Sequence, residues 1–188
     1  MSTATGAARA RARAGDAGEH RVAFRTGWEG YQALARLVDG QPERVRIAFD
    51  GEVVELMSPG APHERDKHRL ERIVAVLTEE RSVPCQAMAS TRWEHPEAAR
   101  ALEADATFYL TRAKILGSRH RSKDIADYPM PDLAIEVDHG ASRVDRESIY
   151  RALAVPEVWS FDGVELRIEV LDGGFQLPTT RLLNSKPS

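Results

Sequence analysis

The stretch Pro131-Asp132-Leu133-Ala134-Ile135-Glu136-Val137-Asp138 decides how the rest of the chain is arranged. Its apolar residues Leu133, Ile135 and Val137 recur with the period of two that a half-buried strand requires. Three carboxylates then share the other face. Carboxylates this close raise one another's pKa, so they need a divalent metal, a paired Lys or Arg, or exposure to water. We expect a metal, with a solvated strand face as the alternative.

The composition predicts one globular domain that carries a tail. The chain has 188 residues, of which 42% are hydrophobic and 29% are charged, enough to bury a sizeable core. The formal net charge of −3 does not indicate a generally basic, nucleic-acid-binding surface. The single cysteine, Cys85, excludes an internal disulfide framework and a cysteine-rich zinc site. Without a run of the ~18 apolar residues that a span needs, we expect a cytoplasmic protein with no membrane partner.

The boundaries of the domain follow from local composition. Residues 1–21 are rich in Ala and Arg and predict a disordered tail, residues 22–183 form the domain, and residues 184–188 form a loose C-terminus. Arginines of the tail could contact phosphates, although a short basic tail is more often simply solvated.

The N-terminal half predicts a helix, a hairpin and a second helix. Apolar residues at helical spacing indicate a helix from Trp28 to Leu37. Residues 45–49 and 52–57 alternate around Asp50-Gly51, which is a strong signal for a hairpin turn. A helix from about His63 carries Leu70 and later apolar residues on one face.

The C-terminal half predicts strands with one further helix. Strands are expected at residues 85–93 and 102–110, followed by a basic connecting loop at 112–128. After the central strand, a helix is expected at 143–153, then a second hairpin around Asp162-Gly163. This order predicts a mixed α/β fold, with a single mixed sheet flanked by helices and with terminal β-hairpins. The Gly-rich phosphate loop, the Gly-x-Ser-x-Gly elbow and the His-Glu-x-x-His pair are missing from the sequence, which excludes those enzyme classes.

Two acids on separate strands form the candidate site. Asp105 and Glu136 each lie in the middle of an expected strand, and adjacent pairing of these strands would bring both carboxylates to one edge. Mg²⁺ needs only one or two carboxylates, because it keeps several waters, and Mn²⁺ would accept the same oxygen ligands. Glu55 and His63 could add a ligand or orient water, although a histidine at a helix start is more often a cap or a surface residue.

Several runs together resemble a known family. They are Leu102–Leu110, Pro131–Asp138 and Ile149–Trp159, preceded by Glu55–Pro59 and His63. This ordered set resembles the Uma-type family of restriction-endonuclease-like proteins, within the PD-(D/E)XK nuclease superfamily.

The resemblance covers roughly residues 28–177. It implies a restriction-endonuclease-like core and a metal-dependent nuclease activity, with the acidic site residues falling on Asp105 and Glu136.

The chain departs from the pattern of this family at one position. Four residues before Tyr150, where the family usually has a lysine, this sequence has Arg146. An arginine can bind phosphate and supply charge, but it stays protonated and cannot transfer a proton. Position 138, two residues after Glu136, holds an aspartate, so Lys123 in the basic loop is the nearest replacement.

The leading hypothesis is a Mg²⁺-dependent DNA endonuclease. In it Asp105 and Glu136 bind the metal, Asp132 or Asp138 assists, and Arg146 contacts the scissile phosphate. Three cations of the basic loop would bind nucleic acid: Arg119, Arg121 and Lys123. Cutting both strands of a duplex takes two active sites, so a homodimer is also expected.

Two other hypotheses stay open. The chain could be a catalytically degenerate nuclease fold that binds nucleic acid or protein. It could also be an α/β domain of another role, in which the acids pair with Arg143, Arg146 and Arg151.

Overall fold

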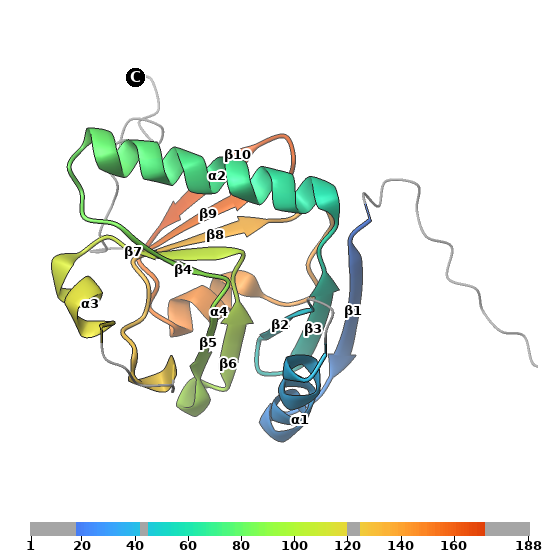
Figure 1. Ribbon diagram of the computed structural model, residues 1–188. Coiled ribbons are helices and arrows are strands. Elements are labelled where there is room, and N and C mark those ends of the chain that lie inside the picture. Colours follow the sequence, from blue (N-terminus) through green and yellow to red (C-terminus); the bar gives the residue numbers. More distant parts are fainter. Residues whose placement is uncertain (1–17, 42–44, 120–124, 172–188) are drawn as a thin grey trace, which may run out of the picture.

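The structure is a computed structural model that describes residues 18–41, 45–119 and 125–171. Within these ranges it contains four α-helices, α1 (Trp28–Asp39), α2 (Ala61–Glu80), α3 (Arg112–Gly117) and α4 (Arg146–Ala152). The strands of the same ranges form two five-stranded sheets (Figure 1). The first sheet has the order β1 (His20–Arg25), β3 (Val53–Ser58), β2 (Arg46–Phe49), β6 (Arg100–Glu103), β5 (Arg92–His95). The second has the order β10 (Leu166–Val170), β9 (Glu157–Phe161), β8 (Leu133–Val137), β7 (Ala106–Tyr109), β4 (Gln86–Ala89).

The mixed α/β fold class is confirmed, but the expectation of a single sheet was wrong. The strands expected at 85–93 and 102–110 each break in the middle, and their halves join different sheets. The first break follows Ala89, whose φ is 52°, and the second falls at Ala104 and Asp105, both fully buried. The periodicity of two runs through both breaks, so it could not reveal them.

Both Asp-Gly hairpins are confirmed. β2 pairs with β3, and β9 with β10, in antiparallel register. Gly51 and Gly163 have φ values of 99° and 96°, a region that glycine enters without steric cost. In each turn the aspartate side chain accepts hydrogen bonds from two following backbone N–H groups, which closes the turn.

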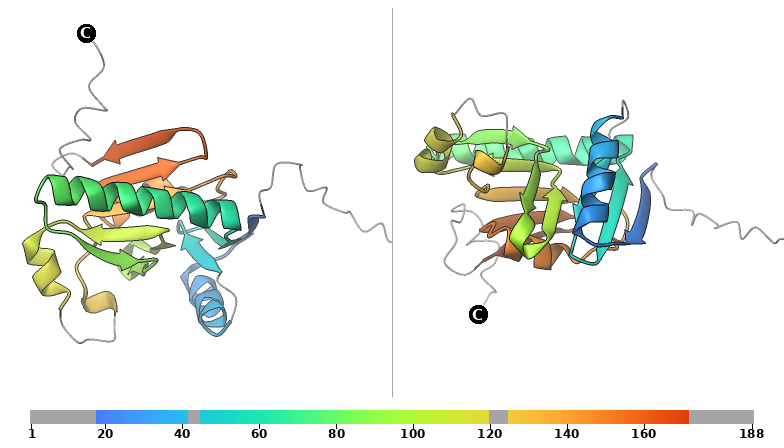
Figure 2. Two further views of the ribbon diagram at one scale, coloured as in Figure 1. Left: turned by 45° about the horizontal axis from the view of Figure 1, so that its top comes forward. Right: turned by 90° about the horizontal axis from the view of Figure 1, so that it is seen from below.

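β8 lies in the middle of the second sheet and is buried on both faces. It pairs with β7 in antiparallel and with β9 in parallel orientation. Leu70 and Val74 of α2 pack on the face that carries Leu133 and Ile135. The opposite face is covered by α4, as Figures 1 and 2 show for the two helices. The acidic face of β8 is therefore an interior face rather than a solvated one.

The helices begin close to the expected positions. α2 begins at Ala61, two residues before His63, and α4 begins at Arg146 after Asp145, whose side chain accepts a hydrogen bond from Ser148 N. α1 packs Tyr31 and Ala35 on the first sheet. The expected basic loop at 112–128 begins with α3, a helix of six residues.

β1 was not predicted. It pairs with β3 from His20 to Arg25, so its first two residues fall inside the segment expected to be a disordered tail, 1–21. Val22 and Phe24 do alternate with Arg21 and Arg25, but this run is short, and both apolar side chains are about half exposed rather than part of the core. Residues 1–17 of that tail and the expected loose C-terminus at 184–188 lie outside the described residues.

None of the helices in the described ranges combines the length and the apolar character that crossing a membrane would take.

Candidate active site

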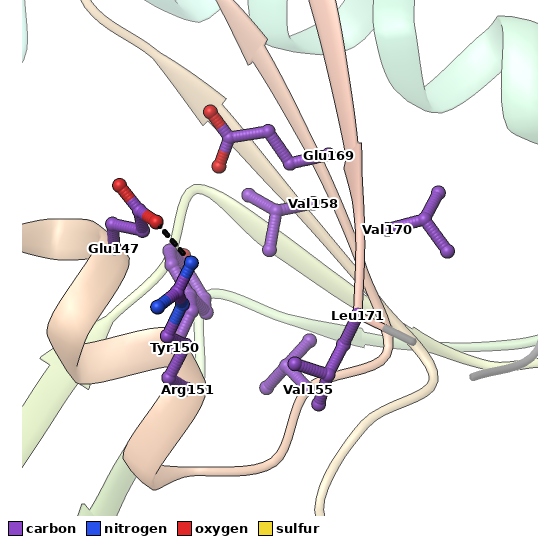
Figure 3. Close-up of a pocket in the computed structure, with 8 residues that line it drawn as sticks. All are labelled: Glu147, Tyr150, Arg151, Val155, Val158, Glu169, Val170 and Leu171. Carbon is purple, nitrogen blue, oxygen red and sulfur yellow. Dashed lines mark ion pairs between the residues drawn. The ribbon is translucent and has the colours of Figure 1, made fainter. Parts of the chain in front are cut away.

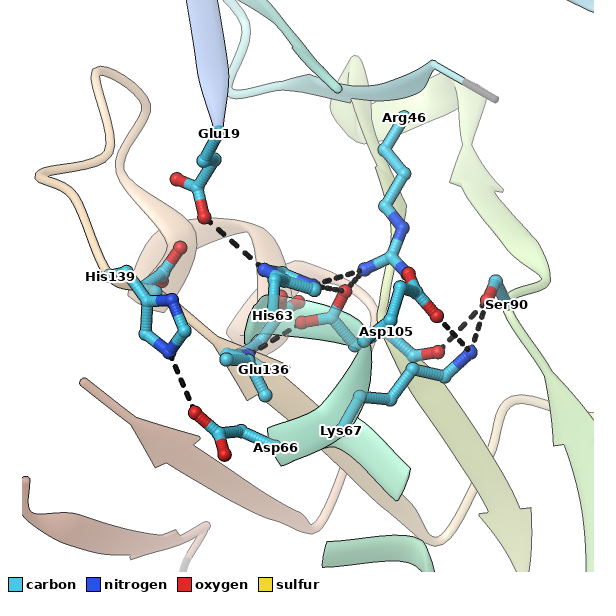
Figure 4. A network of polar contacts seen from close by, with 12 residues as sticks. Glu19, Arg46, His63, Asp66, Lys67, Ser90, Asp105, Glu136 and His139 are labelled. Carbon is cyan, nitrogen blue, oxygen red and sulfur yellow. Dashed lines mark hydrogen bonds and ion pairs between the residues drawn. The ribbon is translucent and has the colours of Figure 1, made fainter. Parts of the chain in front are cut away.

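Asp105 and Glu136 lie at the same end of two neighbouring strands. Ala106 of β7 pairs with Ile135 of β8 in antiparallel register. Asp105 directly precedes Ala106 and Glu136 directly follows Ile135, so both acids come to the same end of the pair. Asp105 is 0% exposed and Glu136 is 2% exposed. The break between β6 and β7 thus puts Asp105 where the two sheets meet, beneath the N-terminal end of α2 (Figure 4).

Asp105 is held by groups from three elements. Its Oδ2 accepts a hydrogen bond of 2.5 Å from Val137 N. The carboxylate thus takes the place of a main-chain carbonyl at the end of the pairing between β7 and β8. Its Oδ1 lies 2.8 Å from His63 Nε2 and forms an ion pair with Arg46 of β2. A buried carboxylate is costly unless its oxygens have such partners.

Glu136 faces α4. It accepts hydrogen bonds from the Tyr150 hydroxyl and from Arg146 Nη1. Burial raises the pKa of Glu136, and the nearby charge of Arg146 offsets this only in part. Burial also raises the pKa of the Tyr150 hydroxyl, together with the charge of Glu136.

Arg146 joins Glu136 to two accessory acids. Its guanidinium lies 3.2 Å from Asp138 Oδ2 and 3.6 Å from Glu55 Oε1. Burial would lower the pKa of Arg146, but these carboxylates and Glu136 raise it above that of an ordinary arginine. The residue therefore stays charged throughout the working pH range.

His63 is buried and contacts a second acid. Its Nδ1 lies 3.2 Å from Glu19 Oε2, and His63 as a whole is 1% exposed. Burial would raise the pKa of Glu19, but hydrogen bonds from His63 and Arg21 outweigh burial and lower the pKa to about 2. His63 is thus a buried connector, which excludes the reading of this residue as a surface histidine.

Arg21 of β1 completes a cluster of charged side chains around the two acids, which consists of Glu19, Arg21, Arg46, Glu55, His63, Asp105, Glu136, Asp138 and Arg146. Its guanidinium contacts Glu19 at 2.5 Å, Glu55 at 2.9 Å and Asp138 at 2.5 Å. Sequence reasoning missed Glu19, Arg21 and Arg46. The only signal available for them was their charge, because, apart from the pair Glu19 and Arg21 itself, their partners lie far away along the chain.

Two further contacts extend from α2. His139 Nε2 lies 3.0 Å from the buried carboxylate of Asp66. Lys67 Nζ donates to Ser90 Oγ at 3.4 Å, and this hydroxyl donates to the Asp105 backbone carbonyl at 2.9 Å. The network of Figure 4 therefore contains a lysine that sequence reasoning did not nominate.

A family model described as "Uma2: Putative restriction endonuclease" matches residues 28–183, which is well over half of the chain. The chain belongs to this family. The resemblance read from the motifs is thereby confirmed, and so is the nuclease-like character of the fold. A search among curated proteins gives no match.

The Uma2 family implies a divalent metal, and the donor set of the cluster fits one in kind. Asp105 and Glu136 supply hard oxygen ligands, and one or two carboxylates with several waters suffice for Mg²⁺. In the described ranges, no group of three or more His, Cys, Asp or Glu side chains is arranged to hold a metal. A metal here would have to share its carboxylates with Arg46 and Arg146, which pair with them in this structure.

Asp132 lies apart from the cluster, at the other end of β8. Its Oδ2 accepts hydrogen bonds from Leu110 N and Thr111 N at 2.7 and 3.0 Å, and its Oδ1 pairs with Lys114 at 2.7 Å. These contacts fix the turn after β7 and the start of α3. Asp132 therefore has a structural position, unlike Asp138.

The basic loop also lies away from the cluster. Figures 1 and 2 show α3 near the C-terminal end of α2, whereas Asp105 contacts His63 near the N-terminal end of that helix. Arg119, just after α3, is exposed. Arg121 and Lys123 lie outside the described residues.

A cavity of about 690 Å³ lies on the far side of α4 (Figure 3). Its lining includes Tyr150 and Arg151 of α4 and Val158 of β9. Arg151 pairs with Glu147 on the helix surface at 2.5 Å. The acids of the cluster do not line this cavity, so the candidate site is distinct from it.

Proposed function

We propose that this chain is a DNA endonuclease that hydrolyses phosphodiester bonds with the help of Mg²⁺ or Mn²⁺. The observation that carries the proposal is the pair Asp105 and Glu136, two buried carboxylates at one end of the β7–β8 ladder. Membership of the Uma2 family supports it. Cleavage of both strands takes two such sites, so a homodimer is part of the proposal.

The principal residues of the site have separate roles in this proposal. Asp105 and Glu136 would hold the ion, which would supply charge neutralisation at a phosphate and a lower pKa for a water. His63 and Val137 N keep the Asp105 carboxylate in one orientation. Arg146 contacts the scissile phosphate and stabilises developing negative charge, but it does not transfer a proton.

Access of the ion to Glu136 requires Arg146 to move. Its guanidinium ends a long side chain and has other acceptors close by, Asp138 at 3.2 Å and Glu55 at 3.6 Å. It can therefore release Glu136 and keep a charged partner. The two accessory acids hold the arginine in this proposal and do not serve as ligands.

The test uses the full chain with supercoiled plasmid and added Mg²⁺ or Mn²⁺. Cleavage is expected in the wild type, with a loss of at least tenfold in Asp105→Asn and in Glu136→Gln. Glu52→Gln is the matched control, since Glu52 is 76% exposed and pairs with Arg25 at the surface. Equal activity in all variants, or no cleavage by the wild type with either metal, contradicts the proposal.

A specific observation favours a second candidate, a degenerate nuclease fold that binds nucleic acid without cutting it. Both acids are paired with arginines, Asp105 with Arg46 and Glu136 with Arg146, which supply the charge that a metal would. Titration calorimetry separates the candidates. Duplex binding without a heat of Mg²⁺ or Mn²⁺ binding, and without cleavage, favours the degenerate fold.

A further inference from the structure

The outward face of α2 is basic over its first half. Between residues 63 and 72 the exposed residues are Arg65, His68, Arg69 and Arg72. They recur at i, i+3, i+4 and i+7, so they form one continuous stripe along the helix. The exposed fractions of the first three side chains are 61%, 73% and 67%.

The acids of the same segment do not share this stripe. Asp66 is buried, while Glu64 and Glu71 are half-buried. Glu64 pairs with Arg46 at 3.1 Å, and Glu71 lies 3.9 Å from Lys67. Glu71 also lies 3.8 Å from His68 of the stripe. The exposed side chains of this part of α2 are therefore basic, whereas its acids are buried or half-buried beside Lys67.

The stripe is connected to the candidate active site through Asp66. The Oδ1 of Asp66 lies 3.0 Å from Arg69 Nη1 and 3.5 Å from Arg65 Nε. Its Oδ2 lies 3.0 Å from His139, next to Asp138. One buried carboxylate thus holds two arginines of the stripe against a residue that borders the cluster.

We infer that the stripe Arg65, His68, Arg69 and Arg72 binds the phosphate backbone of duplex DNA and guides it to the acidic cluster. This inference rests on the proposed function, since it names a surface for the same substrate. From Arg65 to Arg72 the helix rises about 10 Å, a length that carries about three phosphates of one DNA strand. Because the chain has a net charge of −3, a local basic stripe orients a polyanion that the rest of the surface repels.

The basic stripe ends at Arg72. Ile73 and Val76 follow on the exposed side of α2, at 44% and 51% exposed, and the exposed residues near its C-terminal end are the acids Glu79 and Glu80. The cations therefore lie on the N-terminal half of α2, the half whose His63 contacts Asp105.

The test measures the affinity of the full chain for a labelled DNA duplex of about 25 base pairs, without divalent metal and at several salt concentrations. The triple variant Arg65→Gln, Arg69→Gln, Arg72→Gln should flatten the slope of log affinity against log salt by about 2.7, at about 0.9 for each phosphate contact. Glutamine keeps the helix propensity of arginine.

The matched control carries the same change of charge elsewhere, Arg25→Gln, Arg151→Gln and Arg167→Gln, at side chains that are 83%, 69% and 65% exposed. Its slope should equal that of the wild type. Arg72→Gln alone, which leaves Asp66 and its partners intact, should flatten the slope by about 0.9. An unchanged slope in both stripe variants, an equal loss in the control, tighter binding of duplex RNA, or no binding of DNA by the wild type overturns the inference.

The same variants separate this inference from the proposed function. If the wild type binds DNA through the stripe but does not cut it with Mg²⁺ or Mn²⁺, the stripe stands and the endonuclease proposal fails. If the wild type cuts DNA and the stripe variants keep its salt slope, the proposal stands and the inference fails.

Discussion

Arg146 stands where the family resemblance leads us to expect a lysine, and its contacts make it the side chain most worth testing. It is paired with Glu136 and lies 3.2 Å from Asp138. Because an ammonium can reach the same oxygens and also give up a proton, Arg146→Lys should keep or raise the rate of DNA cleavage. Plasmid cleavage with Mn²⁺ measures this.

Arg146→Ala should distinguish the contribution of the arginine charge to cleavage from its effect on metal binding. Glu136 would lose its cation, so metal binding measured by calorimetry should tighten while cleavage falls. The free energy of unfolding should drop by about 3 kcal/mol, since removing one partner leaves a buried charge. If Arg146→Lys and Arg146→Ala behave alike in all three measurements, Arg146 has neither role.

Glu19 should make the stability of the fold depend on acid pH. Burial opposes ionisation, but hydrogen bonds from His63 and Arg21 lower the pKa from 4.5 to about 2. A carboxyl whose folded pKa is depressed stabilises the fold above its unfolded pKa and loses this contribution as the pH falls. As the pH falls from 4.5 to 2, protonation of Glu19 should therefore lower the unfolding free energy of the wild type by up to about 3 kcal/mol.

Denaturant unfolding of the wild type and of Glu19→Gln at a series of pH values measures this contribution. The difference in unfolding free energy between the two proteins should be largest at neutral pH and shrink below pH 4.5. Comparing the two also removes the opposite contribution of Glu136, whose pKa is raised and whose ionisation weakens the fold as the pH rises. A difference that is constant with pH contradicts the prediction.

At the scale of the element, β8 carries both a core residue, Leu133, and a residue of the candidate site, Glu136. Leu133 is fully buried between α2 and the sheet, so Leu133→Ala should lower the free energy of unfolding by about 2–5 kcal/mol. Val164→Ala is the control, because Val164 is 92% exposed and should change it by less than about 0.5 kcal/mol. Urea titration measures both, and equal midpoints would show that β8 does not carry the core.

At the scale of the molecule, the two sheets should unfold together. The chain passes from one sheet to the other three times, between β3 and β4, between β4 and β5 and between β6 and β7, and α4 packs against residues of both. Trp28 reports the core of the first sheet and Trp159 that of the second. Variants that keep only one of these tryptophans should give the same denaturation midpoint by fluorescence.

Two separate midpoints would show instead that each sheet is an independent folding unit. Far-ultraviolet circular dichroism of each variant provides the control, because it follows the secondary structure of both sheets at once. A loss of stability caused by the tryptophan replacements would shift the dichroism and the fluorescence equally.

Local patterns in the sequence determined most of the elements and the two principal acids. Asp-Gly turns specified both hairpins, and helical spacing specified α1, α2 and α4, because these signals act over a few neighbouring residues. The family motifs pointed to Asp105 and Glu136 for the same reason, as each lies in a short characteristic run. β1 was not predicted, because its alternation of Val22 and Phe24 with arginines is short and directly follows the Ala- and Arg-rich segment.

Only the tertiary structure decided where each expected strand breaks and what surrounds the acids. The chain crosses between sheets at Asp105, and that crossing brings Arg46 of β2 and His63 of α2 to one carboxylate. The tertiary structure also decided that Asp138 joins the cluster, whereas Asp132 lies at the opposite end of the same strand. Ion pairs of this kind join residues far apart in the chain, so they depend on how the sheets pack and leave no periodic trace in the sequence.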